Sequence, residues 1–122
     1  ELTMKDFIDL CKRTESRPLL HVAGKDVRLL HAAMGMQTEA GEFTDALKRH
    51  FFYGKELDRV NLVEELGDQL WYIAIAIDAL DSTLEEVMDK VIQKLAVRYP
   101  EKFTDINAIE RNLDAERKEL ET

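Results

Sequence analysis

The chain has 122 residues, of which 45% are hydrophobic and 34% charged, so it is long enough for one compact domain with a real core. Its formal net charge of −8 argues against a protein that binds nucleic acid broadly, because such proteins need a basic surface. The longest apolar run, residues 70 to 77, is far shorter than the roughly 18 residues of a membrane-spanning helix, so no membrane partner is expected.

The chain has a single cysteine, Cys11, which makes an intrachain disulfide impossible. A lone cysteine suits a reducing compartment, and no basic-then-apolar leader opens the chain. Glu1 in first place indicates that a start methionine or a tag has been removed. We therefore expect a cytoplasmic protein in which Cys11 is a small buried residue on a helix.

Apolar residues recur at helical spacing through most of the chain, and only 5 Gly and 2 Pro interrupt it, which predicts an all-α fold. Thr3, followed by Asp6 three residues later, resembles a helix start, and a first helix is expected to about residue 14. Residues 16 to 24 are expected to form a connection.

A long second helix is expected from about residue 26 to residue 53, with Gly54 as its natural stop. Asp58 can cap a third helix, in which apolar residues continue at helical spacing over residues 60 to 77. From residue 70 to residue 80 this helix is apolar on nearly every side, and such a helix is buried all round. That burial is hard to reach in 122 residues without a second subunit, so a homo-oligomer is expected.

Ser82 begins the segment Ser-Thr-Leu-Glu, which predicts a capping box at the start of a fourth helix, and Pro100 ends that helix. A last, weaker helix is expected to start at Thr104 or Asp105. After Asp114 the chain is almost entirely charged, and it is expected to fray.

Two acidic motifs lie inside the otherwise apolar second and third helices: Glu39-Ala-Gly-Glu42 and Glu64-Glu65-Leu-Gly-Asp68. In each motif two carboxylates are three residues apart, so they project from the same face of a helix. Two antiparallel helices can therefore bring Glu39, Glu42, Glu65 and Asp68 together. Glu64 points roughly 100° away from Glu65 and is expected to face solvent or to support the others.

Four converging carboxylates repel one another strongly. Two unit charges about 4 Å apart cost about 4 kcal/mol at an effective dielectric constant of about 20. Such a site must take up protons or hold cations, and carboxylate oxygens select Mg²⁺, Mn²⁺ or Ca²⁺. Because Mg²⁺ on few carboxylates keeps waters and shares substrate phosphates, a phosphate-bearing substrate is expected.

Two glycines hold equivalent places in the motifs, since Gly41 and Gly67 each directly precede the second acid. A glycine inside a helix costs roughly 1 kcal/mol relative to alanine. Close approach of the two helices at the metal site is the predicted compensation.

Other site classes find less support. Single acidic residues on helices usually face solvent, but two pairs of acids at i, i+3 spacing, each with an internal glycine, argue against a purely solvent-exposed role. A di-iron bundle needs Glu-x-x-His, and none of the three histidines has a Glu three residues before it. There is no Walker-type loop and no supported Ser or Cys nucleophile. A non-catalytic helical dimer that binds metal or nucleotide as a sensor or adaptor remains an alternative, as does a phosphatase that leaves a different product.

The paired acids resemble the MazG-like family of all-α nucleoside triphosphate pyrophosphohydrolases. That family is marked by Glu-x-x-Glu and, further on, Glu-x-x-Asp. These motifs correspond here to Glu39/Glu42 and Glu65/Asp68, with 22 residues between the pairs. The likeness extends to Arg111 and includes Leu-Leu-His-Ala-Ala-Met-Gly-Met at 29–36, Glu-Glu-Leu-Gly-Asp-Gln-Leu-Trp-Tyr at 64–72 and Lys-Leu-Ala-Val-Arg-Tyr-Pro-Glu-Lys-Phe at 94–103.

The resemblance implies a single domain over residues 1–122, with a four-helix core at about 26–103 and an extra C-terminal helix. It implies a homodimer or homotetramer that cleaves (deoxy)nucleoside triphosphates between the α- and β-phosphates, with Mg²⁺ as cofactor and Mn²⁺ as a substitute. Some relatives carry a further Glu where this chain has Thr38, so the number of metal ions stays open. No motif here indicates the base.

For the site, the resemblance implies that the four motif acids hold the metal and form the catalytic centre. Trp71 lies beside Tyr72, which is one turn beyond Asp68, and either ring can stack on the base. His31 is expected to be structural. The candidate cations for the leaving pyrophosphate are Lys48, Lys94, Arg98 and Arg111.

Overall fold

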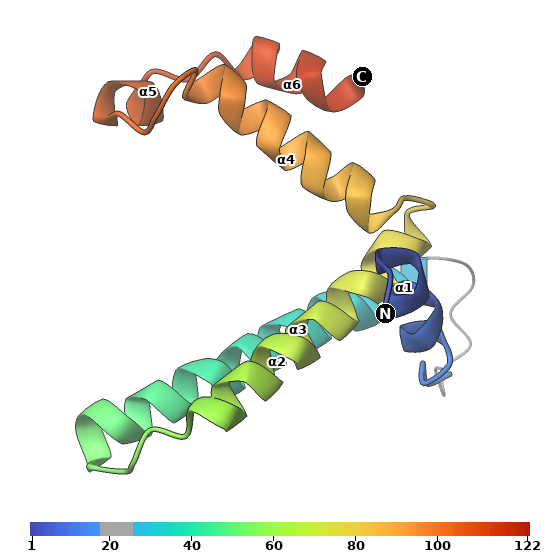
Figure 1. Ribbon diagram of the computed structural model, residues 1–122, viewed down its shortest axis with the longest axis vertical. Helices are drawn as coiled ribbons and strands as arrows, with labels where there is room; N and C mark the ends of the chain where they lie inside the picture. Colours follow the sequence, from blue (N-terminus) through green and yellow to red (C-terminus); the bar gives the residue numbers. More distant parts are fainter. Residues whose placement is uncertain (18–25) are drawn as a thin grey trace. The chain divides into compact units, whose positions relative to one another are not determined.

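The structure is a computed structural model that describes residues 1–17 and 26–122, and every regular element in those ranges is an α-helix (Figure 1). The all-α prediction is therefore confirmed. The helices fall into two compact units, residues 1–82 and residues 83–122. No helix in the described part of the chain is long and apolar enough to cross a membrane. The helices are α1 (Met4–Lys12), α2 (Asp26–Tyr53), α3 (Arg59–Ala79), α4 (Leu84–Arg98), α5 (Asp105–Ile109) and α6 (Leu113–Glu121).

The predicted bounds of the second and third helices agree with the structure, whereas α1 ends at Lys12, two residues before the expected end. Part of the expected connection lies outside the described residues. Thr3 caps α1 by accepting a hydrogen bond from the Asp6 amide. Gly54 follows α2 with a φ of 69°, in the left-handed region where a residue with a Cβ is strained. The Asp58 carboxylate caps α3 by accepting from the amides of Val60 and Asn61.

The predicted capping box of α4 is wrong by one residue. Thr83, not Ser82, caps the helix, and its hydroxyl accepts from the Glu86 amide at 3.1 Å. The Ser82 amide instead donates to the carbonyl of Ile77 at 3.1 Å, so this residue completes the end of α3.

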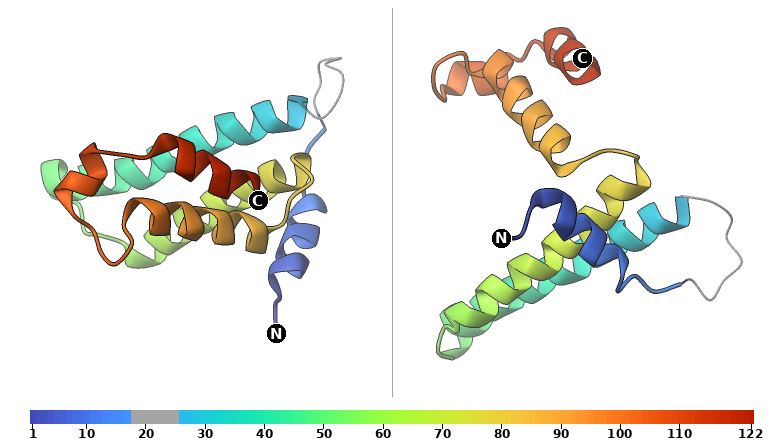
Figure 2. Two further views of the ribbon diagram at one scale, coloured as in Figure 1. Left: turned by 90° about the horizontal axis from the view of Figure 1, so that it is seen from above. Right: turned by 45° about the vertical axis from the view of Figure 1, so that its right-hand side comes forward.

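In the first unit, α2 and α3 lie side by side as an antiparallel hairpin, and α1 contacts α3 near its C-terminal end (Figures 1 and 2). The buried apolar residues gather there. Cys11 is buried as predicted, and burial raises the pKa of its thiol. The core of this unit consists of Ile8, Cys11, Ala32, Ala74, Ile75, Ile77 and Ala79.

The prediction for the two motif glycines is wrong, because a Cβ added at Gly41 or Gly67 would meet nothing within 4 Å. The close approach of α2 and α3 occurs instead at Gly35, where a Cβ would overlap the ring of Tyr72. Gly35 therefore lets the ring of Tyr72 approach α2 closely.

In the second unit, α4 packs against α6. The predicted fraying after Asp114 is wrong, and the expected last helix is divided into α5 and α6. Asn112 caps α6 by accepting from the Ala115 amide at 3.0 Å. The Glu116 side chain is then buried between Arg98 and Arg111, with N–O distances of 2.8 and 2.6 Å. A tertiary ion-pair cluster therefore anchors this charged segment.

The apolar character of α3 does not lead to burial all round within one chain. Its C-terminal half supplies the core, but Val60 is 80% exposed and Val63 is 69% exposed. Within the first unit these residues are exposed, and the homo-oligomer stays a prediction.

Candidate metal centre

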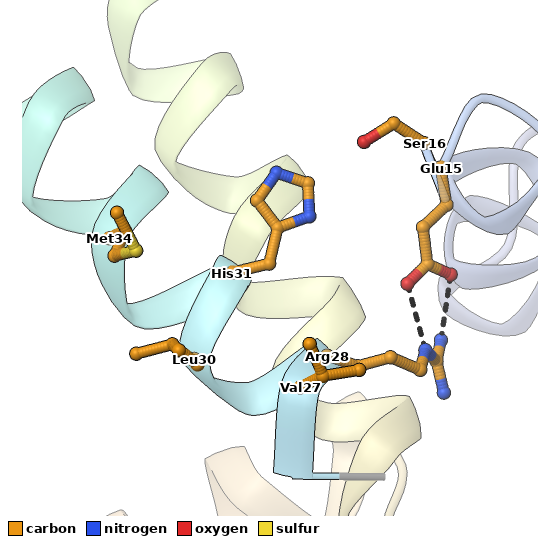
Figure 3. A pocket seen from close by; sticks show the side chains of 7 residues that line it. All are labelled: Glu15, Ser16, Val27, Arg28, Leu30, His31 and Met34. Atoms are coloured by element: carbon orange, nitrogen blue, oxygen red, sulfur yellow. Dashed lines mark hydrogen bonds and ion pairs between the residues drawn. The ribbon is translucent and has the colours of Figure 1, made fainter. Parts of the chain in front are cut away.

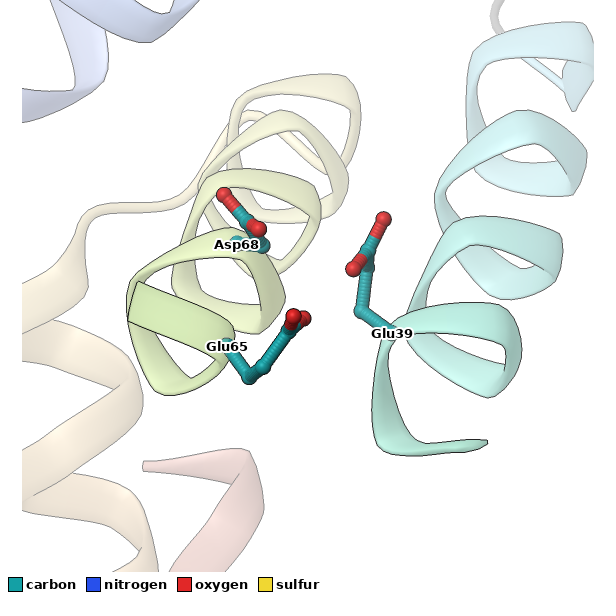
Figure 4. Close-up of side chains that lie close together, drawn as sticks. All are labelled: Glu39, Glu65 and Asp68. Atoms are coloured by element: carbon teal, nitrogen blue, oxygen red, sulfur yellow. The ribbon is translucent and has the colours of Figure 1, made fainter. Parts of the chain in front are cut away.

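Three carboxylates converge between α2 and α3 (Figure 4). Glu39 projects from α2, while Glu65 and Asp68 project from α3 toward it. Each offers an oxygen that lies within 4.8 Å of the others. The i, i+3 spacing on α3 and the antiparallel hairpin thus bring three of the four predicted acids together.

Glu65 is the most buried of the three, with 8% of its surface exposed. Its Oε1 atom accepts a hydrogen bond from the Asn61 side-chain amide at 3.3 Å, whereas its Oε2 atom is buried with no hydrogen-bond partner. Within residues 1–17 and 26–122, no lysine or arginine forms an ion pair with these carboxylates. A buried, unpaired carboxylate oxygen is costly, so the cluster is chemically suited to a hard divalent cation.

The pKa of Glu39 also indicates a cluster with excess negative charge. The pKa of Glu39 is raised, first by burial and then by the negative charges of Asp68 and Glu65, with Glu42 adding to the effect. The cluster therefore holds an excess of negative charge that a proton or a cation must offset.

A cleft of about 430 Å³ opens beside the cluster, within the range of roughly 300–1,000 Å³ that is usual for small-molecule sites. The ring of Tyr72 meets the rings of Trp71 and His31 edge-on, with centroid distances of 4.9 and 5.6 Å. The cleft is lined by Thr14, Ser16, His31, Glu39, Asp68, Trp71 and Tyr72.

A comparison with protein-family models matches residues 30–103 to the MazG nucleotide pyrophosphohydrolase domain. The chain belongs to this family. The matched MazG region contains all four motif acids and more than half of the chain, while Thr14 and Ser16 precede it. Comparisons with curated proteins and with solved structures give no match.

Of the MazG motif acids, Glu42 is the one that lies outside the cluster of three. It is exposed and lines a separate hollow of about 360 Å³, which also borders Glu65. Two cations that no sequence motif singles out, Arg49 and Lys55, line the same hollow. The role of Glu42 as a metal ligand stays a prediction.

Of the four candidate cations, Lys48 belongs to the first unit and the other three, Lys94, Arg98 and Arg111, belong to the second. Lys48 is near Asp45, with an N–O distance of 3.9 Å, and lies over the ring of Tyr53. Lys94 is half-buried on α4. Their contacts with a leaving pyrophosphate stay predictions, as do those of Arg98 and Arg111, which hold Glu116 in the second unit.

Trp71 and Tyr72 line the same cleft as Glu39 and Asp68, and their contact with a substrate stays a prediction. The indole N–H of Trp71 donates to the hydroxyl of Thr14 at 2.9 Å. No sequence pattern singles out Thr14, because the two residues are 57 positions apart. Only the docking of α1 on α3 brings them together.

Proposed function

We propose that this MazG-family chain hydrolyses (deoxy)nucleoside triphosphates to the monophosphate and pyrophosphate, with Mg²⁺ as cofactor and Mn²⁺ as a substitute. The observation that carries the proposal is the unpartnered, buried Oε2 atom of Glu65 among converging carboxylates. The adjoining cleft, with its aromatic rings, supports a nucleotide as the ligand.

Glu39, Glu65 and Asp68 would hold the cation, with Glu42 as a further ligand. When bound, the cation would offset the charge of the triphosphate and lower the pKa of the attacking water. Water adds to the α-phosphorus, the bond to the α,β-bridging oxygen breaks, and pyrophosphate leaves with that electron pair. Trp71 and Tyr72 would orient the nucleoside by stacking.

The leaving pyrophosphate carries several negative charges and needs cations around it. We assign Lys48, Lys94, Arg98 and Arg111 to this role, the last three because they belong to the family-like segment. Within the first unit, Arg49 and Lys55 line the hollow beside Glu42 and can contribute as well.

The test is to incubate the protein with a panel of ribo- and deoxynucleoside triphosphates and to identify the products by phosphorus NMR, in Mg²⁺ and in excess EDTA. The proposal expects pyrophosphate and monophosphate with Mg²⁺ and no turnover with EDTA. Orthophosphate and diphosphate as products would indicate a different phosphatase. Tight nucleotide binding without turnover would indicate a sensor or adaptor, and full turnover in EDTA would end the metal-dependent mechanism.

A further inference from the structure

We infer that the segment directly after α1, residues 14–16, forms the wall of the cleft that recognises the nucleobase, with Thr14 and Ser16 as specificity-determining residues and Arg28 as the residue that positions them. The inference rests on the proposed function only in taking the ligand to be a nucleotide. It assigns a role to residues that precede the matched MazG region.

The cleft residues follow an order along the α2–α3 hairpin. On α2, Glu39 and His31 are eight residues apart, which at 1.5 Å per residue is about 12 Å along the helix. On α3, Trp71 and Tyr72 lie one turn beyond Asp68, on the side away from the hairpin turn. The acids are thus at one end of the cleft, and the rings and the segment after α1 are toward the other. A nucleotide has the same polarity, since its sugar separates the base from the phosphates.

The segment after α1 that lines the cleft is fixed by several hydrogen bonds. The Thr14 hydroxyl donates to the carbonyl of Cys11 at 3.1 Å and accepts from Trp71 at 2.9 Å. Glu15, the next residue, accepts from Nε and Nη2 of Arg28 at 2.8 and 2.9 Å (Figure 3). Ser16 follows directly and lines both the cleft and an adjoining hollow of about 250 Å³.

Arg28 joins three helices at this point. Besides Glu15, its guanidinium forms an ion pair with Asp78 near the end of α3, with an N–O distance of 2.9 Å. Asp78 also forms an ion pair with Lys12 of α1, with an N–O distance of 3.2 Å. The side chains of Arg28, Glu15 and Asp78 are 27%, 16% and 25% exposed, so solvent screens these pairs only partly. A lysine in place of Arg28 would keep the charge but lose the two-pronged contact.

The hydroxyls suit the polar edge of a base. Thr14 already uses its hydrogen on Cys11 and one lone pair on Trp71, so it can accept one further hydrogen bond, such as one from a base amino or imino group. The Ser16 hydroxyl can donate or accept. With the ring of the base stacked against Trp71 or Tyr72, the hydroxyls of Thr14 and Ser16 would form hydrogen bonds with the polar groups on the edge of the base.

Calorimetry in Mn²⁺ tests this by titrating the protein with each common nucleoside monophosphate and, separately, with inorganic pyrophosphate. Thr14→Val and Ser16→Ala should each lower the affinity for the preferred monophosphate about 5-fold, as expected for one lost hydrogen bond. Their affinity for pyrophosphate should match the parent. Thr14→Ser keeps the hydroxyl and should bind like the parent.

Arg28→Lys tests the positioning role. It should raise KM for the preferred triphosphate about 5-fold, with a much smaller change in kcat and an unchanged pyrophosphate affinity, because the wall loosens while the acids stay in place. Lys5→Ala is the control, since Lys5 is 85% exposed on α1 and pairs only with Asp9 among the described residues.

The inference is overturned if Thr14→Val and Ser16→Ala melt like the parent and bind every monophosphate as the parent does. It is equally overturned if the parent binds no monophosphate, or if pyrophosphate affinity falls as much as monophosphate affinity. Since binding is measured without turnover, the two proposals fail separately. A parent that binds monophosphate but releases no pyrophosphate ends the proposed function alone, whereas an active parent with unaltered wall variants ends this inference alone.

Discussion

At the scale of one residue, Glu39 shows that the negative charge of the cluster lowers the stability of the metal-free protein. Its pKa lies above the ordinary value of 4.5, chiefly because of burial and the neighbouring carboxylates. Between the unfolded and the folded pKa the native state binds more protons than the unfolded state, so the metal-free protein gains stability as the pH falls through that window. At a pH above the folded-state pKa of Glu39, its carboxylate is ionised in both states, and the full loss of folding stability caused by its burial and its neighbours is present.

Glu39→Gln removes this titration. Without metal, the variant should melt above the parent at pH 7, and the difference should shrink as the pH falls toward 4.5. Thermal melts in EDTA across this pH range measure the effect. Glu64→Gln, which removes a charge from an exposed neighbour on α3, serves as the control. A gap between Glu39→Gln and the parent that does not change with pH would contradict the explanation.

Much of the site follows from local spacing. The i, i+3 geometry of α3 is enough to predict that Glu65 and Asp68 act together, and one more turn brings in Tyr72. The position of Glu42 outside the cluster depends on the rotation of α2 against α3, which spacing on one helix does not determine. Thr14 joins the cleft through a contact across 57 residues, for which the sequence carries no local signal.

At the scale of the elements, the contact between α2 and α3 depends on Gly35. Gly35→Ala should force Tyr72 away from α2 and lower the free energy of unfolding by about 1–3 kcal/mol, as overpacking typically does. Gly41→Ala is the control, because its Cβ would enter open space and should raise stability by up to about 1 kcal/mol. Urea unfolding measures both. Equal effects of the two substitutions would show that the Gly35 contact is unimportant.

The attachment of α6 depends on Glu116. The guanidinium groups of Arg98 and Arg111 lower the pKa of Glu116 from 4.5 to about 2. The stabilisation is therefore present above pH 4.5 and is lost as the pH falls toward 2. Glu116→Gln should be less stable than the parent at pH 7, and the difference in melting temperature should shrink as the pH falls through this acid range. Circular-dichroism melts measure the difference. A gap that persists at pH 2 would contradict the ion-pair account.

Helix boundaries are predictable where the chemistry is local. The caps at Thr3 and Asp58 and the stop at Gly54 depend on neighbouring residues alone, and they agree with the structure. The order of α6 is not predictable in this way, because a charged tail frays unless a distant partner holds it. That partner is Arg98, 18 residues before Glu116.

At the scale of the whole molecule, each unit taken by itself exposes apolar side chains. Val60 and Val63 lie on α3, while Ile106 and Ile109, at 68% and 82% exposure, lie on α5. Exposed apolar surface of this kind usually marks an association site. The sequence predicts the need for a partner from the apolar α3, but it does not say which half of the helix remains uncovered.

Sedimentation velocity should therefore show a homodimer or homotetramer, well above the monomer mass of 14.1 kDa. Val63→Lys places a charge on the exposed face of α3 and should shift the distribution toward the monomer. A stable, active parent at the monomer mass would refute the homo-oligomer.

The measurement that tests the central claim most directly compares stability and turnover in Asp68→Asn and Glu42→Gln. If the acids form a cation site, removing one relieves repulsion, so both variants should melt at or above the parent without metal. With Mg²⁺ they should gain less stability than the parent and lose orders of magnitude in pyrophosphate release. Glu64→Gln, beside the cluster but exposed, should follow the parent in both measurements. If Asp68→Asn and Glu42→Gln instead melt well below the parent without metal and keep parental turnover, the acids are structural and the account is wrong.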